Sequence, residues 1–218
     1  MSTYKEIIGK KIKSVSSDPS DSADGQMWYN TTTQSLRGLA LTSAWSSGAS
    51  ATNSPRIFSG GDGPINAGWM AGGGSASPND IASTEEYNGS GWSAGGDLPG
   101  ATYGAAGVGP QTAALFFGGN NGSILAAAYE YDGSSWASPT SMPTGRQYIN
   151  RAGTQTAALA FGGANPGPTS NTATSQYDGS SWTAGGALPT GIEYAAGTGT
   201  QTAALAAGGY HQPGGTTE

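Results

Sequence analysis

Few side chains in this sequence could carry chemistry. It has no Cys and one His, His211, in a Gly- and Pro-rich stretch near the end of the chain. Thiol catalysis, disulfides, Cys-containing zinc sites and metal sites with two imidazoles are therefore excluded. A Ser-His-Asp triad would need His211, and such a loop position does not supply the fixed geometry of a general base. We expect no catalytic residue, no metal site and no cofactor.

One acidic residue recurs in a fixed context, the motif Tyr-Asp-Gly-Ser-Ser-Trp. Asp132 and Asp178 occupy its second position in two copies, and Asn88 stands there in a third, related copy. A catalytic carboxylate pair would occur once, whereas one Asp per repeat with Asn as a substitute is typical of a turn. Asp-Gly between aromatic residues also favours a hairpin, because primed turns need positive φ. We predict that Asp132 and Asp178 are turn residues.

The composition limits the classes of partner. The 218 residues include 8 Lys or Arg and 14 Asp or Glu, a net charge of -6. So few cations make a nucleic-acid partner unexpected. No window approaches the about 20 apolar residues of a membrane span, and charges interrupt any signal peptide at the start. The regular recurrence of 6 Trp and 10 Tyr among 38 Gly and 12 Pro indicates a folded chain and argues against disorder.

Internal repetition is the strongest pattern in the sequence. The pentapeptide Gln-Thr-Ala-Ala-Leu begins at Gln111, Gln155 and Gln201, which lie 44 and 46 residues apart. A Gly-Gly pair follows each copy, and residues 67–73 form a weaker copy of the same strand. In step with these, Tyr-(Asp/Asn)-Gly-Ser-x-Trp recurs, and a Leu-Pro or Met-Pro pair follows each Trp. The three motif copies span residues 87–92, 131–136 and 177–182.

This period near 45 residues predicts one four-stranded sheet per repeat, as in the blade of a β-propeller. In one unit we expect strands at residues 148–152, 156–161, 172–177 and 181–183, with the first turn at 153–155. The Ala-rich second strand and the Gly pair would suit a crowded region where backbones approach closely. Tyr and Trp would supply the packing between blades.

The order of these marks resembles the kelch repeat, which builds β-propellers. An apolar strand ends in Gly-Gly, then come a Tyr and a Trp, and in one copy Met142 and Pro143 lead to Arg146. The Arg is absent from the other clear copies. The resemblance covers residues 45–218 and implies a mostly β domain of about four four-stranded kelch-like blades. The last blade would be incomplete, so we expect this domain to be truncated.

Two segments precede the repeats. All Lys residues lie within the first 13 residues, among several Ile, so we predict that residues 1–24 are an arm that docks on a partner and is ordered only where it touches another chain. Residues 25–44 are predicted to form a β-hairpin, with strands at 26–30 and 36–41. The candidate docking residues are Tyr4, Ile7, Ile8, Ile12, Trp28 and Tyr29.

The run Asp-Gly-Gln-Met-Trp-Tyr-Asn-Thr-Thr-Thr at residues 24–33 is similar to a segment near the beginning of virion proteins of marine bacteriophages, notably tail and tail-fibre proteins. Repeats like Tyr-Asp-Gly-Ser-Ser-Trp also occur in those proteins. The resemblance implies a structural protein of the phage tail, anchored to other virion proteins through its N-terminus and homo-oligomeric.

In that setting the propeller would serve host attachment by binding a surface glycan or receptor. The loops at residues 74–81, 120–125 and 164–171 differ between units, as recognition loops on a repeat scaffold do. Two alternatives stay open. One is an extracellular or cell-surface carbohydrate-binding propeller, and the other is a glycan hydrolase.

Overall fold

The protein is mostly β. The computed structural model describes residues 6–7, 10–19, 27–38, 48–52, 56–57, 59–74, 80–165, 167 and 170–212. All regular elements in these ranges are β-strands, and none of the described residues forms a helix that could span a membrane. The chain divides into two compact units, Met1–Ser47 and Gly48–Glu218. The predicted mostly β fold is confirmed.

The first unit contains a short hairpin and a three-stranded sheet. In the hairpin, β1 (Glu6–Ile7) pairs with β2 (Lys10–Lys11) in antiparallel orientation. In the sheet, β4 (Met27–Asn30) pairs with β5 (Ser35–Gly38), which confirms the predicted hairpin around a polar turn. A third strand, β3 (Lys13–Val15), runs parallel to β4 on its other side.

The expectation that residues 1–24 are ordered only against another chain is wrong for β3. A two-stranded hairpin is marginal in water, and β3 supplies a third strand from the arm itself. Asp18 stabilises this sheet. Its carboxylate accepts hydrogen bonds from Trp28 Nε1 (2.9 Å) and Asn30 Nδ2 (2.8 Å) and forms an ion pair with Arg37 Nη1 (2.6 Å). These interactions lower the pKa of Asp18, and the hydrogen bond from Asn30 is the largest cause.

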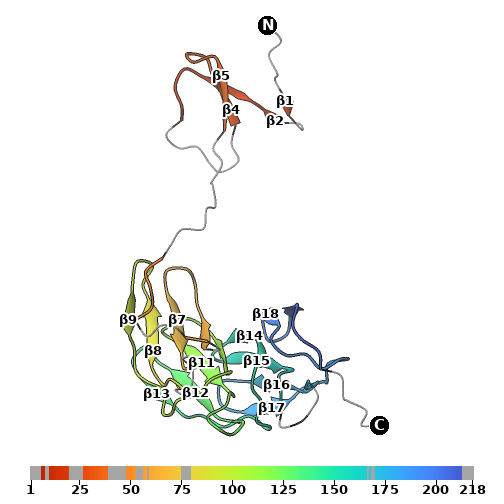
Figure 1. Cartoon of the computed structure of the whole chain (residues 1–218). Coiled ribbons are helices and arrows are strands. Elements are labelled where there is room, and N and C mark those ends of the chain that lie inside the picture. Colours follow the sequence, from red (N-terminus) through yellow and green to blue (C-terminus); the bar gives the residue numbers. More distant parts are fainter. Residues whose placement is uncertain are drawn as a thin grey trace. The chain divides into compact units, whose positions relative to one another are not determined.

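In the described part of the second unit there are three four-stranded antiparallel sheets and one two-stranded sheet (Figure 1). Within each sheet the strands follow sequence order. The strands of the first sheet are β6 (Gly60–Asp62), β7 (Gly68–Ala71), β8 (Thr84–Tyr87) and β9 (Trp92–Ala94). Those of the second are β10 (Ala106–Val108), β11 (Ala114–Phe117), β12 (Ala128–Tyr131) and β13 (Trp136–Ala137).

The third sheet contains the unit whose strands were predicted individually. Its strands are β14 (Asn150–Thr154), β15 (Ala157–Phe161), β16 (Thr174–Tyr177) and β17 (Trp182–Ala184), so all four are confirmed. The first turn lies later than predicted, because Thr154 pairs with Ala157 and only two residues connect the strands. Gly153 remains inside β14 at a φ of +105°, where a Cβ would lie 2.1 Å from the Ala157 carbonyl oxygen.

The fourth sheet has two strands within the described residues, β18 (Ala196–Gly199) and β19 (Ala204–Ala207). The first strands of successive sheets lie side by side: β6 next to β10, β10 next to β14, and β14 next to β18. Arg151 on β14 ties three of them together, since its guanidinium donates to the carbonyls of Gly107 on β10 and Gly61 on β6. Successive sheets are thus in contact through their first strands.

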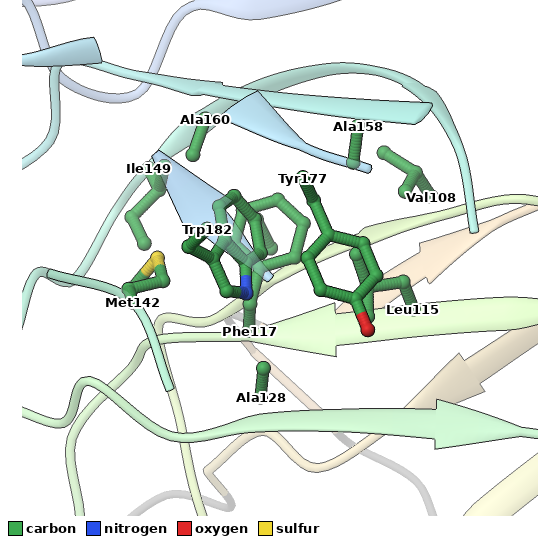
Figure 2. Packing of buried hydrophobic residues seen from close by; sticks show 11 residues of the cluster. Val108, Leu115, Phe117, Ala128, Met142, Ile149, Ala158, Ala160, Tyr177 and Trp182 are labelled. Atoms are coloured by element: carbon green, nitrogen blue, oxygen red, sulfur yellow. The ribbon is translucent and has the colours of Figure 1, made fainter. Parts of the chain in front are cut away.

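Aromatic side chains pack each sheet against the one before it. Trp182 and Tyr177 of the third sheet lie in one apolar cluster with Phe117 of the second sheet (Figure 2), and the Phe117 and Trp182 rings meet edge to face at 5.1 Å. Trp136 of the second sheet meets Trp69 of the first in the same manner at 5.6 Å. The Tyr–Trp hairpin of one sheet therefore covers the second strand of the preceding sheet.

Polar contacts repeat at the same joints. Tyr131 Oη donates to Glu86 (2.7 Å) on the preceding sheet, and Tyr177 Oη donates to Glu130 (2.9 Å) one repeat later. Burial is the main cause that raises the pKa of Tyr131 to about 12. The Gln of the repeated pentapeptide also bonds to the preceding sheet, since Gln155 Nε2 donates to the carbonyls of Ala114 and Tyr131. These contacts give the recurring Tyr and Gln a structural role between sheets.

A buried arginine occupies the third repeat. Arg146 has no exposed surface, and its guanidinium donates to the Gly162 carbonyl (3.1 Å), the Ala173 carbonyl (2.7 Å) and Ser175 Oγ (2.8 Å). Burial lowers its pKa to about 10. The group therefore stays cationic at neutral pH and is held by polar groups where β15 ends and β16 begins.

Arg56 is the counterpart in the first repeat, 90 residues before Arg146. Its guanidinium donates to the Ser83 carbonyl (3.1 Å) and forms an ion pair with Glu85 (2.7 Å), which has no exposed surface and stands where the third repeat has Ser175. A buried Arg thus occupies this position in a copy where the sequence pattern was too weak to show it. Burial lowers the Arg56 pKa, while the Glu85 charge opposes this.

Candidate functional site

One end of the second unit gathers the segments that differ most between repeats. The segment that enters the first strand and the segment that follows the second strand bridge one another in each repeat. The bridges join Ile57 with Gly74, Tyr103 with Asn120, Gln147 with Ala164, and Glu193 with Tyr210. We call this end the loop face. Loop 120–125 is described completely, whereas much of loops 74–81 and 164–171 lies outside the described residues.

A row of three tyrosines crosses the loop face. The Tyr148 and Tyr194 rings stack with centroids 4.4 Å apart, and Tyr103 follows at 6.5 Å from Tyr148. Backbone hydrogen bonds connect the same segments. Tyr148 N donates to the Gly104 carbonyl, and Tyr194 N donates to the Tyr148 carbonyl. The row therefore joins the segments that enter the second, third and fourth sheets.

Two members of the tyrosine row have a strained backbone. The φ angles are +54° at Tyr148 and +59° at Tyr194, and Gly104 has +67° at the equivalent position. A left-handed conformation costs a bulky residue about 1–2 kcal/mol relative to Gly. Strain of this kind clusters at binding and catalytic sites. The repeat with Gly shows that the turn itself does not need a tyrosine.

The phenols of Tyr148 and Tyr194 are neutral at physiological pH. Burial is the main cause that raises the pKa of both Tyr148 and Tyr194, and hydrogen bonding between the phenols also acts on these values. Tyr194 is nevertheless 48% exposed. Neutral phenols both donate and accept hydrogen bonds, and their rings offer apolar faces. The row can therefore bind a ligand through stacking and hydrogen bonds without a formal charge.

Polar side chains surround the tyrosines. Asn120 Nδ2 donates to Gln147 Oε1 (3.0 Å) beside the row. Glu193 is 5% exposed and accepts a hydrogen bond from Ser170 Oγ (3.1 Å). The one histidine lies near this end, with His211 Nδ1 2.8 Å from the Gly191 carbonyl. Amide, hydroxyl and aromatic groups of this kind recognise sugars or a protein surface.

The structure confirms that Asp132 and Asp178 are turn residues. Asp178 Oδ1 accepts hydrogen bonds from the backbone N of Ser180 and Ser181, at 2.9 and 2.8 Å. Asp132 makes the same bonds one repeat earlier, and Asn88 replaces it in the first sheet. These bonds lower the pKa of each Asp to about 2, and the largest cause is the backbone N of the second serine, Ser135 or Ser181. No group of three or more possible metal ligands lies among the described residues.

Acid should weaken the turn that Asp178 stabilises. Its folded pKa is about 2 and the ordinary value is 3.8, so its contribution to stability is present above pH 3.8 and is lost as the pH falls toward 2. Urea unfolding of Asp178→Asn and of the unchanged chain should give nearly equal midpoints at pH 7, because Asn also makes this turn. The unchanged chain should lose more stability than the variant between pH 4 and pH 2. Equal losses would show that the turn bonds do not stabilise the fold.

The candidate docking residues belong to the first unit. Tyr4 and Ile8 lie outside the described residues, and Ile7 is described only by its place in β1. Ile12 and Tyr29 are partly exposed, whereas Trp28 is 5% exposed and packs within its own sheet. Trp28 therefore has a clear structural role, and docking through the other residues stays a prediction.

Neither the protein-family models nor the curated proteins contain a match to this chain.

Proposed function

We propose that this chain is a structural and recognition protein of a bacteriophage tail. In this proposal the first unit anchors the chain to other virion proteins, and the repeats form a kelch-like β-propeller that binds a glycan or receptor on the host surface. The chain would act as a homo-oligomer and without catalysis. The tyrosine row on the loop face is the observation that carries the recognition part.

Two features support a propeller. Each repeat is an antiparallel meander of strands in sequence order, and the first strands of successive sheets lie side by side. Radial repetition of four-stranded sheets has this local arrangement, with the first strands innermost. In such a ring the loop face would be one of the two flat ends, where several repeats contribute to a single binding surface.

The strained tyrosines support recognition at that end. Stacking of Tyr148 on Tyr194 at 4.4 Å leaves Tyr194 half exposed, although Gly would satisfy the turn without strain. An exposed aromatic ring with amide and carboxyl side chains nearby is suited to a saccharide, whose C–H faces pack on rings and whose hydroxyls need hydrogen-bond partners. We therefore favour a glycan ligand for this surface.

Binding to an array of bacterial surface polysaccharides tests this proposal. We expect the full chain to bind at least one glycan and to release no reducing sugar from it. Release of reducing sugar would instead favour the glycan hydrolase, and the absence of any bound glycan would count against a carbohydrate ligand. Copurification of the protein with phage particles separates the virion protein from a secreted carbohydrate-binding module.

Replacing Tyr194 by Asn should separate binding from folding. Asn accepts the left-handed backbone, and the Tyr194 ring is half exposed, so we expect the free energy of unfolding to change by less than about 1 kcal/mol. Loss of the ring should weaken glycan binding at least tenfold, which corresponds to about 1.4 kcal/mol. Array binding and urea unfolding of the same preparation measure both. A variant that binds as the unchanged chain does would remove the tyrosine row from the proposed site.

Removing residues 1–47 should abolish incorporation into the particle and leave the repeats folded. The deletion removes one compact unit as a whole, including β3, which a cut after residue 24 would take from its sheet. Circular dichroism and the unfolding midpoint of the shortened chain should match those of the second unit in the full chain. Normal incorporation of the shortened chain would contradict anchoring through the first unit.

A further inference from the structure

All Lys and Arg side chains of the second unit are bound within it. Residues 48–218 contain three Arg, no Lys and ten Asp or Glu, so this unit carries a net charge of -7. The Arg56 side chain is 3% exposed and forms an ion pair, and Arg146 has no exposed surface and donates to two carbonyls and a hydroxyl. Arg151 donates to carbonyls of β10 and β6. Each arginine of this unit thus binds oxygen atoms of the protein itself.

Carboxylates, in contrast, lie at the loop face. Glu193 bridges Tyr210 through its backbone, and its side chain accepts a hydrogen bond from Ser170 Oγ at 3.1 Å. In the first repeat, Asp80 bridges Gly74 within the loop that follows β7. Like charges that meet across an interface repel and lower the affinity. An anionic ligand would therefore approach the tyrosine row against the charge of the protein.

Recognition of an acidic sugar would need a cation or a helix N-terminus at the tyrosine row. Carboxylate, sulfate and phosphate groups are held mostly by Arg or Lys through charge-assisted hydrogen bonds, or by the first turn of a helix. All regular elements among the described residues are strands, and the arginines bind other groups. The row instead offers aromatic rings beside the bonded amides of Asn120 and Gln147 (3.0 Å), which suit the C–H faces and hydroxyls of an uncharged sugar.

We propose that the loop face selects uncharged glycans and excludes acidic ones, meaning polysaccharides that carry carboxylate, sulfate or phosphate groups. This inference rests on the glycan-binding function proposed above and adds the charge of the ligand as the basis of selection. An uncharged polymer keeps every stacking contact and hydrogen bond. An acidic polymer meets repulsion and leaves its anionic groups without a cationic partner, so the two differ in affinity.

Matched forms of one polymer test the proposal on the full chain. The probes are the bacterial surface polysaccharides of the array. Each is printed beside a sample whose primary hydroxyls are oxidised to carboxylates, and beside that sample after methyl esterification. Displacement of the labelled untreated polymer measures binding, so an acidic polymer held only by the lysines of the first unit is not counted.

We expect the oxidised form to compete at least about tenfold more weakly than the untreated polymer, and the methyl ester to recover most of this loss. Binding of the untreated polymer should be nearly independent of salt between about 0.01 and about 1 M, over which the Debye length falls from about 30 Å to about 3 Å. Both are measured at about pH 8, where an ordinary histidine is neutral.

A lysine placed at the loop face should relax the selection. Ser123 is exposed in loop 120–125, so Ser123→Lys adds a cation there. It should raise the affinity for the oxidised polymer about tenfold near 0.01 M salt, and most of this gain should be lost near 1 M. The matched control is Ile65→Lys, because Ile65 is 91% exposed in the turn between β6 and β7, at the opposite end of the strands. Circular dichroism checks that both variants stay folded.

The outcomes separate this inference from the glycan-binding function. Equal competition by the oxidised and untreated forms would overturn the charge selection, and so would equal effects of the two lysines. Binding of acidic polysaccharides alone, weakened by Tyr194→Asn, would also overturn it but would leave glycan binding at the loop face intact. If no polysaccharide of either kind binds, both proposals are wrong.

Discussion

Replacing Glu85 by Ala should lower the free energy of unfolding of the second unit by about 3–5 kcal/mol, because it leaves a buried arginine without its counter-ion. Glu85 has no exposed surface, and it accepts hydrogen bonds from Arg56 Nη2 (2.7 Å), Thr52 N (2.7 Å) and Thr52 Oγ1 (2.9 Å). The loss would reach both the first sheet and the segment that leads into it. Urea unfolding followed by tryptophan fluorescence measures it.

The third repeat supplies the matched control, Glu85→Ser. There Ser175 accepts a hydrogen bond from Arg146 at 2.8 Å, and no acidic partner for that arginine lies among the described residues. A serine at position 85 should therefore restore part of the stability that Ala removes. Equal losses for Ala and Ser would mean that the charge of Glu85, and not its bond to the guanidinium, holds Arg56.

Replacing Trp182 by Ala should cost about 3–5 kcal/mol, and the same change at Trp92 should cost clearly less. The two residues are equivalent in the repeat, but Trp182 is 7% exposed against Phe117, whereas Trp92 is only partly buried. Stability should thus follow the packing between sheets and not the motif alone. Urea unfolding of both variants, with circular dichroism at 215–220 nm as a second probe, compares them.

Trp182→Phe refines this test. Among the described residues the Trp182 Nε1 has no hydrogen-bond partner, whereas Trp136 Nε1 in the preceding joint donates to Thr84 Oγ1, where the later joint has Ala128, and to the Gly96 carbonyl. Phe should therefore cost much less at position 182 than Ala does, since it keeps most of the buried area and removes an unsatisfied donor. If Trp92→Ala proves as costly as Trp182→Ala, the tryptophans do not act as joints between successive sheets.

Repetition made most of the second unit predictable from the sequence. Recurring Gln, Gly-Gly, Tyr and Trp positions indicated the repeat length, and the Asp-Gly pair located the hairpin turn before Trp182. The length of the turn between β14 and β15 was harder to predict. The two-residue connection after Thr154 depends on Gly153, which stays within a strand at positive φ. The missing information there was backbone geometry, which the residue pattern does not encode.

The candidate site was less predictable for a related reason. The variable loops pointed to one end of the unit, but nothing marked Tyr148 and Tyr194, whose positive φ appears only in the folded backbone. Their recurrence 46 residues apart was the available signal. Arg56 and Asp18 were missed because their partners, Glu85 and Trp28, lie in other strands, and such pairing depends on tertiary contacts.

Nuclear magnetic resonance of the chain with labelled tyrosine rings, titrated with a glycan identified on the array, tests the loop face most directly. If the tyrosine row is the binding surface, the ring signals of Tyr103, Tyr148 and Tyr194 should shift on binding. Those of Tyr131 and Tyr177, buried between sheets, should stay unchanged. Shifts confined to tyrosines away from the row would contradict the assignment of the loop face as the site of recognition.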